Sequence, residues 1–142
     1  MTVSEAIIKW LKEFNPAEYW KIHKINTDLM HNDVDYVLVK EPIRNVKTFI
    51  SGTQVITEHY QFRARLEVIN DKDSVENEAW LEALTDWIYN QNLHKAFPQL
   101  HSGEVQTIGI ASPFYLGRAE DRKAIYQLTI FIRYMKKKRR IA

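Results

Sequence analysis

The sequence predicts an α+β fold, a mainly antiparallel five-stranded sheet with a long helix and an N-terminal helix packed on one face. Two observations carry this prediction. Residues 54–69 alternate between an apolar and a polar face, as a half-buried antiparallel strand does. Residues 74–92 repeat apolar side chains at the spacing of one helical face. Short links between consecutive predicted strands favour antiparallel pairing.

The helix predicted at residues 74–92 has the largest apolar stripe of any predicted helix. We expect Ser74 to be its N-cap, because a serine hydroxyl accepts a hydrogen bond from a first-turn N–H. Glu76 and Glu78 follow where the helix dipole favours negative charge. We expect the stripe to pack on the sheet as core rather than to line a ligand pocket. Its members are Trp80, Leu81, Leu84, Trp87 and Ile88.

The N-terminal helix is predicted from a capping box, in which Thr2 is the N-cap and Glu5 reaches back. Asn15 should end this helix, because the residue before a proline is pushed out of the helical region. Pro16 can then begin a second, short helix. Residues 23–33 are polar and irregular, and we expect a loop there.

The five strands are expected where apolar residues alternate or cluster between turn signals. Gly52 should form the turn before the longest strand, since glycine adopts positive φ readily. We expect loops at residues 93–103 and 113–121. The predicted strands are residues 34–39, 44–50, 54–69, 104–112 and 122–134.

Length and charge predict one domain, residues 1–135, followed by a basic C-terminal tail, residues 136–142. Five of the 20 basic residues lie in that tail: Lys136, Lys137, Lys138, Arg139 and Arg140. The rest of the chain is mildly acidic, with 18 acidic residues against the other 15. The net charge of +2 therefore does not describe a basic surface over the whole domain.

Composition also excludes several classes of site. The absence of cysteine excludes disulfides, thiol nucleophiles and cysteine-ligated zinc. No apolar run approaches the roughly 18 residues that span a bilayer, and the N-terminus lacks the features of a secretory signal. We therefore expect no membrane partner.

The search for chemistry in the sequence is mostly negative. Four glycines form neither a phosphate loop nor a dinucleotide fingerprint, and the five histidines make no metal-binding pair. Asp71 and Asp73 begin like a calcium loop, but Glu76 stands where that loop needs a glycine. We predict no catalytic, metal or cofactor site and expect that the protein is not an enzyme.

Four residues are candidates for partner contacts. Arg63 and Arg65 lie on the polar face of the longest strand, where they can bind a partner or pair with acidic neighbours on adjacent strands. Phe114 and Tyr115 follow Pro113 in an expected loop. Two large apolar residues on a loop either dock against a partner or pack back on their own domain.

The basic tail has three interpretations. It can be a solvated C-terminus without a function of its own. Its five charges can instead neutralise several phosphates of nucleic acid without reading the sequence. A membrane-surface patch is the weakest interpretation, because the tail has no adjoining amphipathic helix or lipidation signal.

Three segments in a fixed order resemble a known family. The first contains Asp35-Tyr36-Val37, Ile50-Ser51-Gly52-Thr53 and Tyr60-Gln61-Phe62. The second contains Trp80-Leu81, Asp86-Trp87-Ile88, Gln91-Asn92 and Phe97-Pro98-Gln99-Leu100, and the third runs from Lys123-Ala124-Ile125-Tyr126-Gln127 to Tyr134. Together, over about residues 34–135, they resemble the tail-terminator or "minor capsid" proteins of long-tailed phages and prophages of Gram-positive bacteria.

This resemblance implies a non-enzymatic virion protein at the head–tail junction, assembled in the host bacterial cytoplasm. Such a protein forms a homo-oligomeric ring, typically a hexamer, which caps the tail tube protein and docks the head–tail connector. DNA passes through the lumen without sequence specificity, and the tail residues 136–140 are candidates to face it. The alternatives are another head–tail connector or head-closure subunit, and a small nucleic-acid-binding module that uses the basic tail.

Overall fold

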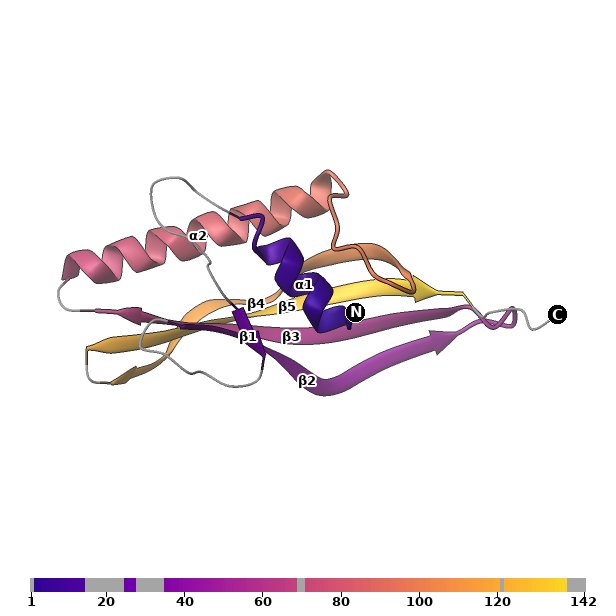
Figure 1. The fold of residues 1–142 in the computed structure, drawn as a ribbon, viewed down its shortest axis with the longest axis horizontal. Helices are drawn as coiled ribbons and strands as arrows, with labels where there is room; N and C mark the ends of the chain where they lie inside the picture. Colours follow the sequence, from indigo (N-terminus) through magenta and orange to yellow (C-terminus); the bar gives the residue numbers. More distant parts are fainter. Residues whose placement is uncertain (1, 15–24, 28–34, 69–70, 121, 138–142) are drawn as a thin grey trace.

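A computed structural model describes residues 2–14, 25–27, 35–68, 71–120 and 122–137 (Figure 1). The predicted α+β class is confirmed, with an antiparallel sheet and two helices that lie on the same side of it. The strand order is β1-β2-β3-β5-β4. The elements are α1 (Val3–Leu11), β1 (Ile25–Thr27), β2 (Asp35–Thr48), β3 (Gln54–Glu67), α2 (Asp71–Leu93), β4 (Glu104–Glu120) and β5 (Lys123–Lys136).

The sheet is mainly antiparallel, as predicted, but its strands are not the five that the sequence predicts. The predicted strands 34–39 and 44–50 are one strand, β2, in which Pro42 falls inside a register shift between Lys40 and Arg44. An outer strand tolerates proline at such an irregularity, because no neighbouring strand needs its missing N–H. The described sheet therefore has four long antiparallel strands. Its fifth member, β1, has three residues, runs parallel to β2 and lies inside the expected loop 23–33.

The expected loop at 113–121 is also wrong. Residues 104–120 form one strand, β4, whose pairing with β5 has four register shifts between Val105 and Arg118. These irregularities accommodate Pro113 and Gly117, because β4 lies at the edge of the described sheet. Arg122, with a φ of 63°, lies between β4 and β5.

The core lies between the helices and one face of the sheet. β3 and β5 pair along their whole length, with Tyr60 opposite Ile130 and Phe62 opposite Leu128. Alternate residues of both strands point toward the helices and are buried, as the period-2 pattern predicts. On β3 they are Ile56, Glu58, Tyr60, Phe62, Ala64 and Leu66, and on β5 Ala124, Tyr126, Leu128, Ile130, Ile132 and Tyr134.

The first helix confirms Thr2 as an N-cap, since the Glu5 N–H donates to Thr2 Oγ1 at 3.1 Å. α1 buries Ile7, Trp10 and Leu11, which lie on one face of the helix. It ends at Leu11, four residues before Asn15. The short helix predicted from Pro16 lies outside the described residues.

The long helix begins earlier than predicted, at Asp71, so Ser74 lies inside α2 and is not its N-cap. The acidic first turn favours this earlier start, because negative charge stabilises a helix N-terminus. Four members of the predicted stripe are buried, whereas Trp87 is half-buried and packs against Trp10 and Phe14. The stripe is thus core, as predicted. No helix in the described ranges is long and apolar enough to cross a membrane.

Candidate functional site

The hairpin between β2 and β3 forms one end of the molecule. Its turn lies beyond the ends of α2, β4 and β5 along the long axis (Figure 1). The Phe49 N–H donates to the Thr53 carbonyl and the Gly52 N–H to the Phe49 carbonyl, both at 2.8 Å. Gly52 has a φ of 89°, which confirms the predicted need for glycine at this turn.

The end of this hairpin is exposed and apolar. Every residue from Pro42 to Ser51 is exposed, and we call residues 42–51 the hairpin tip. Four large apolar side chains lie within it, with exposed fractions of 72% for Ile43, 41% for Val46, 45% for Phe49 and 110% for Ile50. Several exposed large apolar side chains in such a short segment favour a surface that contacts another molecule.

The two long edges of the sheet differ. On β4, the Asn92 side chain accepts hydrogen bonds from the Ile108 N–H and the Thr107 hydroxyl, both at 3.0 Å, and so occupies part of that edge. On β2, the short strand β1 pairs only with residues 36–38. Over the strands that the structure describes, the outer edge of β2 beyond Leu38 has no strand partner. An open strand edge can pair with another chain.

A buried carboxylate anchors the base of the hairpin. Glu58 is 1% exposed and points toward the helix side of β3. Its carboxylate accepts a hydrogen bond from the Tyr134 hydroxyl at 2.6 Å and lies 2.7 Å from Lys40 Nζ and 3.5 Å from Arg44 Nε. Because Lys40 and Arg44 flank the register shift of β2, these contacts tie the irregular edge strand to the centre of the sheet.

Three pKa shifts report the electrostatics of this cluster. Burial opposes ionisation of Glu58, but its bonds to Lys40 and Tyr134 and the charge of Arg44 outweigh that effect and lower its pKa. Burial and the bond to Glu58 raise the pKa of Tyr134 to about 12. Burial and the Glu58 charge also raise the pKa of Tyr60. The cluster is therefore a carboxylate with two cations and two neutral tyrosines at neutral pH.

A cavity of about 610 Å³ adjoins this cluster, between the start of α1 and the sheet. Its lining includes Glu58, Tyr60 and Tyr134. A carboxylate held ionised by two cations is not a general base poised near neutral pH, which would need a raised pKa. We interpret the cluster as a clamp on the hairpin.

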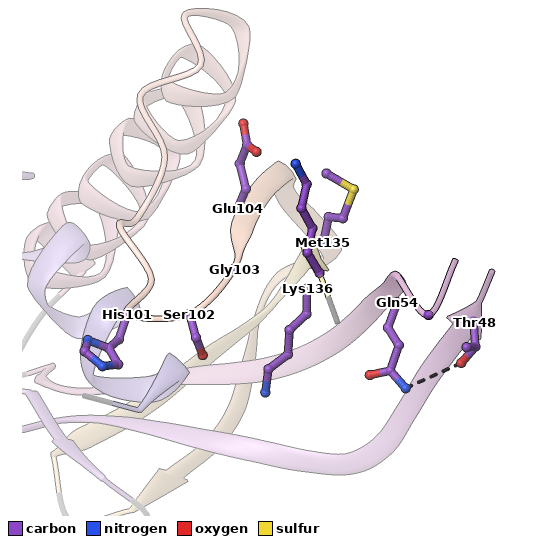
Figure 2. A pocket seen from close by; sticks show the side chains of 10 residues that line it. Thr48, Gln54, His101, Ser102, Gly103, Glu104, Met135 and Lys136 are labelled. Carbon is purple, nitrogen blue, oxygen red and sulfur yellow. Dashed lines mark hydrogen bonds between the residues drawn. The ribbon is translucent and has the colours of Figure 1, made fainter. Parts of the chain in front are cut away.

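A groove of about 1050 Å³ lies beside the hairpin tip. Figure 2 shows Thr48 and Gln54 on the hairpin, with Gln54 Nε2 donating to Thr48 Oγ1 at 3.4 Å, and Glu104 and Met135 on β4 and β5 of the same sheet. Lys136 and Lys137, the first residues of the predicted basic tail, are exposed and line this groove. Lys138, Arg139 and Arg140 lie outside the described residues.

The predicted arginines lie on the face of the sheet without helices, as their alternation in β3 predicts. Arg63 is half-buried and donates to Gln61 Oε1 at 2.6 Å, and Gln61 Nε2 donates to Glu41 at 3.2 Å. Arg65 is half-buried on the same face. The Arg63 side chain is therefore bonded within its own sheet, to a chain of neighbouring polar side chains.

The predicted pair of aromatics separates onto two faces, because both residues are in a strand rather than in a loop. Phe114 packs partly buried against the core. Tyr115 is 47% exposed, and the Gln127 side chain donates to its hydroxyl. Only Tyr115 remains available to a partner.

Sequence reasoning missed both main features of this end of the molecule. Glu58, Tyr60 and Phe62 are alternate residues of β3 and therefore point to the same face of the sheet. The alternation alone could have indicated a buried carboxylate. The hairpin tip was missed because Val46, Phe49 and Ile50 look like buried strand residues. Their exposure depends on where the neighbouring elements end, which no local pattern reports.

Among the described residues, no group of three or more metal-ligating side chains is placed to hold a metal ion. No model of a known protein family matches the chain, and no curated protein sequence matches it.

Proposed function

We propose that the protein is a non-enzymatic structural protein of a long-tailed phage or prophage, a tail terminator at the head–tail junction. In this role it forms a ring, caps the tail tube and provides the surface on which the head docks. The observation that carries the proposal is the hairpin tip, with four exposed large apolar side chains on β2 and on the turn that follows it. The resemblance of residues 34–135 to tail-terminator proteins supplies the specific role.

The hairpin tip favours assembly for a physical reason. Apolar side chains held in water cost free energy, about 25 cal/mol for each Å² that a partner could cover. A projecting contact differs from the surface that receives it, so copies join head to tail. Head-to-tail contacts close into a ring when the rotation between copies allows it.

The buried clamp at Glu58 supports the same role. A projecting hairpin binds a neighbour with less loss of entropy when its base is already fixed. Lys40, Arg44 and Tyr134 hold that base through a carboxylate that is 1% exposed. We infer that the clamp presents the tip in one orientation to its partner.

The DNA contact is a separate part of the proposal. Lys136 and Lys137 are exposed at the end of β5 and begin the basic run that continues to Arg140. In a ring through which DNA passes, such charges suit phosphates and need no base contacts.

Mass measurement in solution combined with negative-stain imaging, with and without purified tail tubes, tests the proposal. We expect rings at one end of each tube. A matched variant with Phe49→Ser and Ile50→Ser should keep its thermal stability, because both side chains are exposed, and should lose the caps. A wild-type protein that stays monomeric and never associates with tubes would overturn the proposal.

A further inference from the structure

A second exposed stripe runs along α2, opposite the buried one. Its members are separated by three or four residues, so they lie on one line of the helix surface. The line faces away from the sheet, because it is half a turn from the buried residues Leu84 and Ile88. The stripe consists of Val75, Glu78, Glu82, Asp86, Tyr89 and Leu93.

The stripe combines acidic and apolar side chains. Val75, Tyr89 and Leu93 are 65%, 63% and 59% exposed, so they contribute little to the core of their own chain. The whole helix contains six acidic residues and a single lysine. We call the exposed stripe the α2 stripe, and it consists of Val75, Glu78, Glu82, Asp86, Tyr89 and Leu93.

The hairpin tip has the complementary composition. Its apolar residues accompany Arg44 and Lys47, and it contains no acidic residue. Arg44 already pairs with Glu58. Lys47 lies over the ring of Phe49, with Nζ 5.4 Å from the ring centroid, and within the described residues it has no carboxylate partner within 4.0 Å. Lys47 is therefore available to a carboxylate on another molecule.

The spacing of the two surfaces also agrees. Lys47 precedes Phe49 by about 7 Å along the chain, and Ile50 follows in the turn. Asp86 and Glu82 precede Tyr89 by about 4.5 and 10.5 Å along the helix axis. When Phe49 and Ile50 contact Tyr89, Lys47 therefore reaches the acidic middle of the α2 stripe.

We propose that the hairpin tip of one copy docks on the α2 stripe of a second copy of this chain. The inference rests on the proposed function, since it names the contact that builds the ring. Phe49 and Ile50 cover Tyr89 and Leu93, and Lys47 lies between Glu82 and Asp86. The two surfaces differ, so each copy donates its hairpin to one neighbour and receives a hairpin from the other.

Engineered cysteines test this contact cleanly, because the chain has none of its own. In rings assembled on tail tubes, the double variant Ile50→Cys/Tyr89→Cys should form a disulfide-linked ladder up to the full ring. Either single variant should give no ladder. The matched control is Ile50→Cys/Glu76→Cys, because Glu76 is exposed on α2 but lies off the stripe. It should give at least tenfold less ladder.

A charge exchange provides the second test. Glu82→Lys should reduce the number of capped tube ends about tenfold, since it places like charges at the contact. Adding Lys47→Glu should restore the caps, because the exchanged pair is again complementary. Glu76→Lys, with the same change of charge off the stripe, should leave the number of caps unchanged.

The outcomes separate this inference from the proposed function. Wild-type rings without a ladder from the paired cysteines, or rings insensitive to Glu82→Lys, would overturn the docking contact and leave the ring in place. Absence of wild-type rings on tubes would overturn both. A ladder from the stripe pair together with rescue by the charge exchange would establish the contact.

Discussion

Glu58 is the residue that most needs an explanation, because it is a carboxylate on the apolar face of a central strand. Burial of an unpaired charge would cost several kcal/mol. Glu58 is instead bonded to Lys40 and Tyr134 and lies near Arg44. Removing one member of this cluster leaves buried polar groups without partners. The loss of stability is then larger than the net stabilisation that the bonds provide.

Substitution Glu58→Gln tests the clamp. We expect a loss of about 2 kcal/mol in the free energy of unfolding at pH 7, because bonds to a charged group are lost. The pKa of Glu58 is lowered in the folded state from an ordinary value of 4.5, so its contribution is present above that pH. As the pH falls through the lowered pKa, the contribution disappears and the wild type approaches the variant.

Denaturant unfolding at pH 7 and at pH 3 measures this difference. Glu13→Gln, at an exposed position, is the matched control and should change the stability little at either pH. An equal gap between the wild type and Glu58→Gln at both pH values would contradict the ionised clamp.

Trp80 and Trp87 of α2 differ in burial, because Trp80 lies inside the core and Trp87 at its edge. Trp80 is 1% exposed, so Trp80→Ala should cost about 3–5 kcal/mol. Trp87 is half-buried, with its ring 4.7 Å from that of Trp10, and Trp87→Ala should cost about 2 kcal/mol. Equilibrium denaturation measures both, and a larger loss for Trp87 would contradict this packing.

At the scale of elements, the outer strand β4 has a close packing constraint on the face without helices. Gly109 pairs with Phe131 on β5, and a Cβ at Gly109 would lie 2.9 Å from Phe131 Cε1. A Cβ at Gly117, on the same strand, would lie no closer than 3.5 Å to its nearest neighbour, Gln127 Oε1. The ring of Phe131 therefore covers one glycine and not the other.

Alanine substitutions at these two glycines should differ. Gly109→Ala should lower stability by about 1–2 kcal/mol, because the Phe131 ring must move out of a packed position. Gly117→Ala should change it by less than about 0.5 kcal/mol. Thermal unfolding of the two variants measures the difference, and equal effects would show that Phe131 is free to shift.

The helices and the central strands could be predicted because their periodicity is local. Residues 3–11, 54–67 and 123–136 report their faces through side-chain spacing alone. The outer strands could not, because β2 and β4 contain Pro42 and Pro113, and proline is tolerated only where a strand lacks a neighbour on one side. That lack of a neighbour is a property of the sheet order, which the sequence pattern does not contain.

The candidate site was less predictable than the fold for a related reason. Arg63 and Arg65 were placed on the correct face, but half-burial and bonds within the sheet reduce their availability. Only the turn at residues 49–53 extends past the ends of β4, β5 and α2 (Figure 1), whereas residues 44–48 lie level with the last residues of β5. The exposure of the turn depends on where these three elements end.

At the scale of the whole molecule, basic and acidic surfaces are separated. The hairpin tip is apolar and basic, α2 is acidic, and Lys136 and Lys137 line the groove beside the tip. This polarity suits head-to-tail assembly, because like surfaces repel and unlike surfaces attract.

The basic tail gives a prediction at this scale. If the five charges of residues 136–140 contact phosphates, the logarithm of DNA affinity should fall with the logarithm of salt with a slope of about −4.5. Deletion of residues 136–140 should remove most of that dependence. Titration of labelled duplex at several salt concentrations measures it, and a deletion that changes neither binding, virion assembly nor DNA ejection would contradict the contact.

A tail terminator of the kind we propose stops growth of the tail tube. The most direct test of this role adds fresh tube subunits to purified tubes that have been incubated with the protein, and measures tube length by electron microscopy. We predict that capped tubes stay at their starting length, while tubes incubated with the Phe49→Ser/Ile50→Ser variant elongate. Elongation of tubes at the same rate with and without the wild-type protein would contradict the claim.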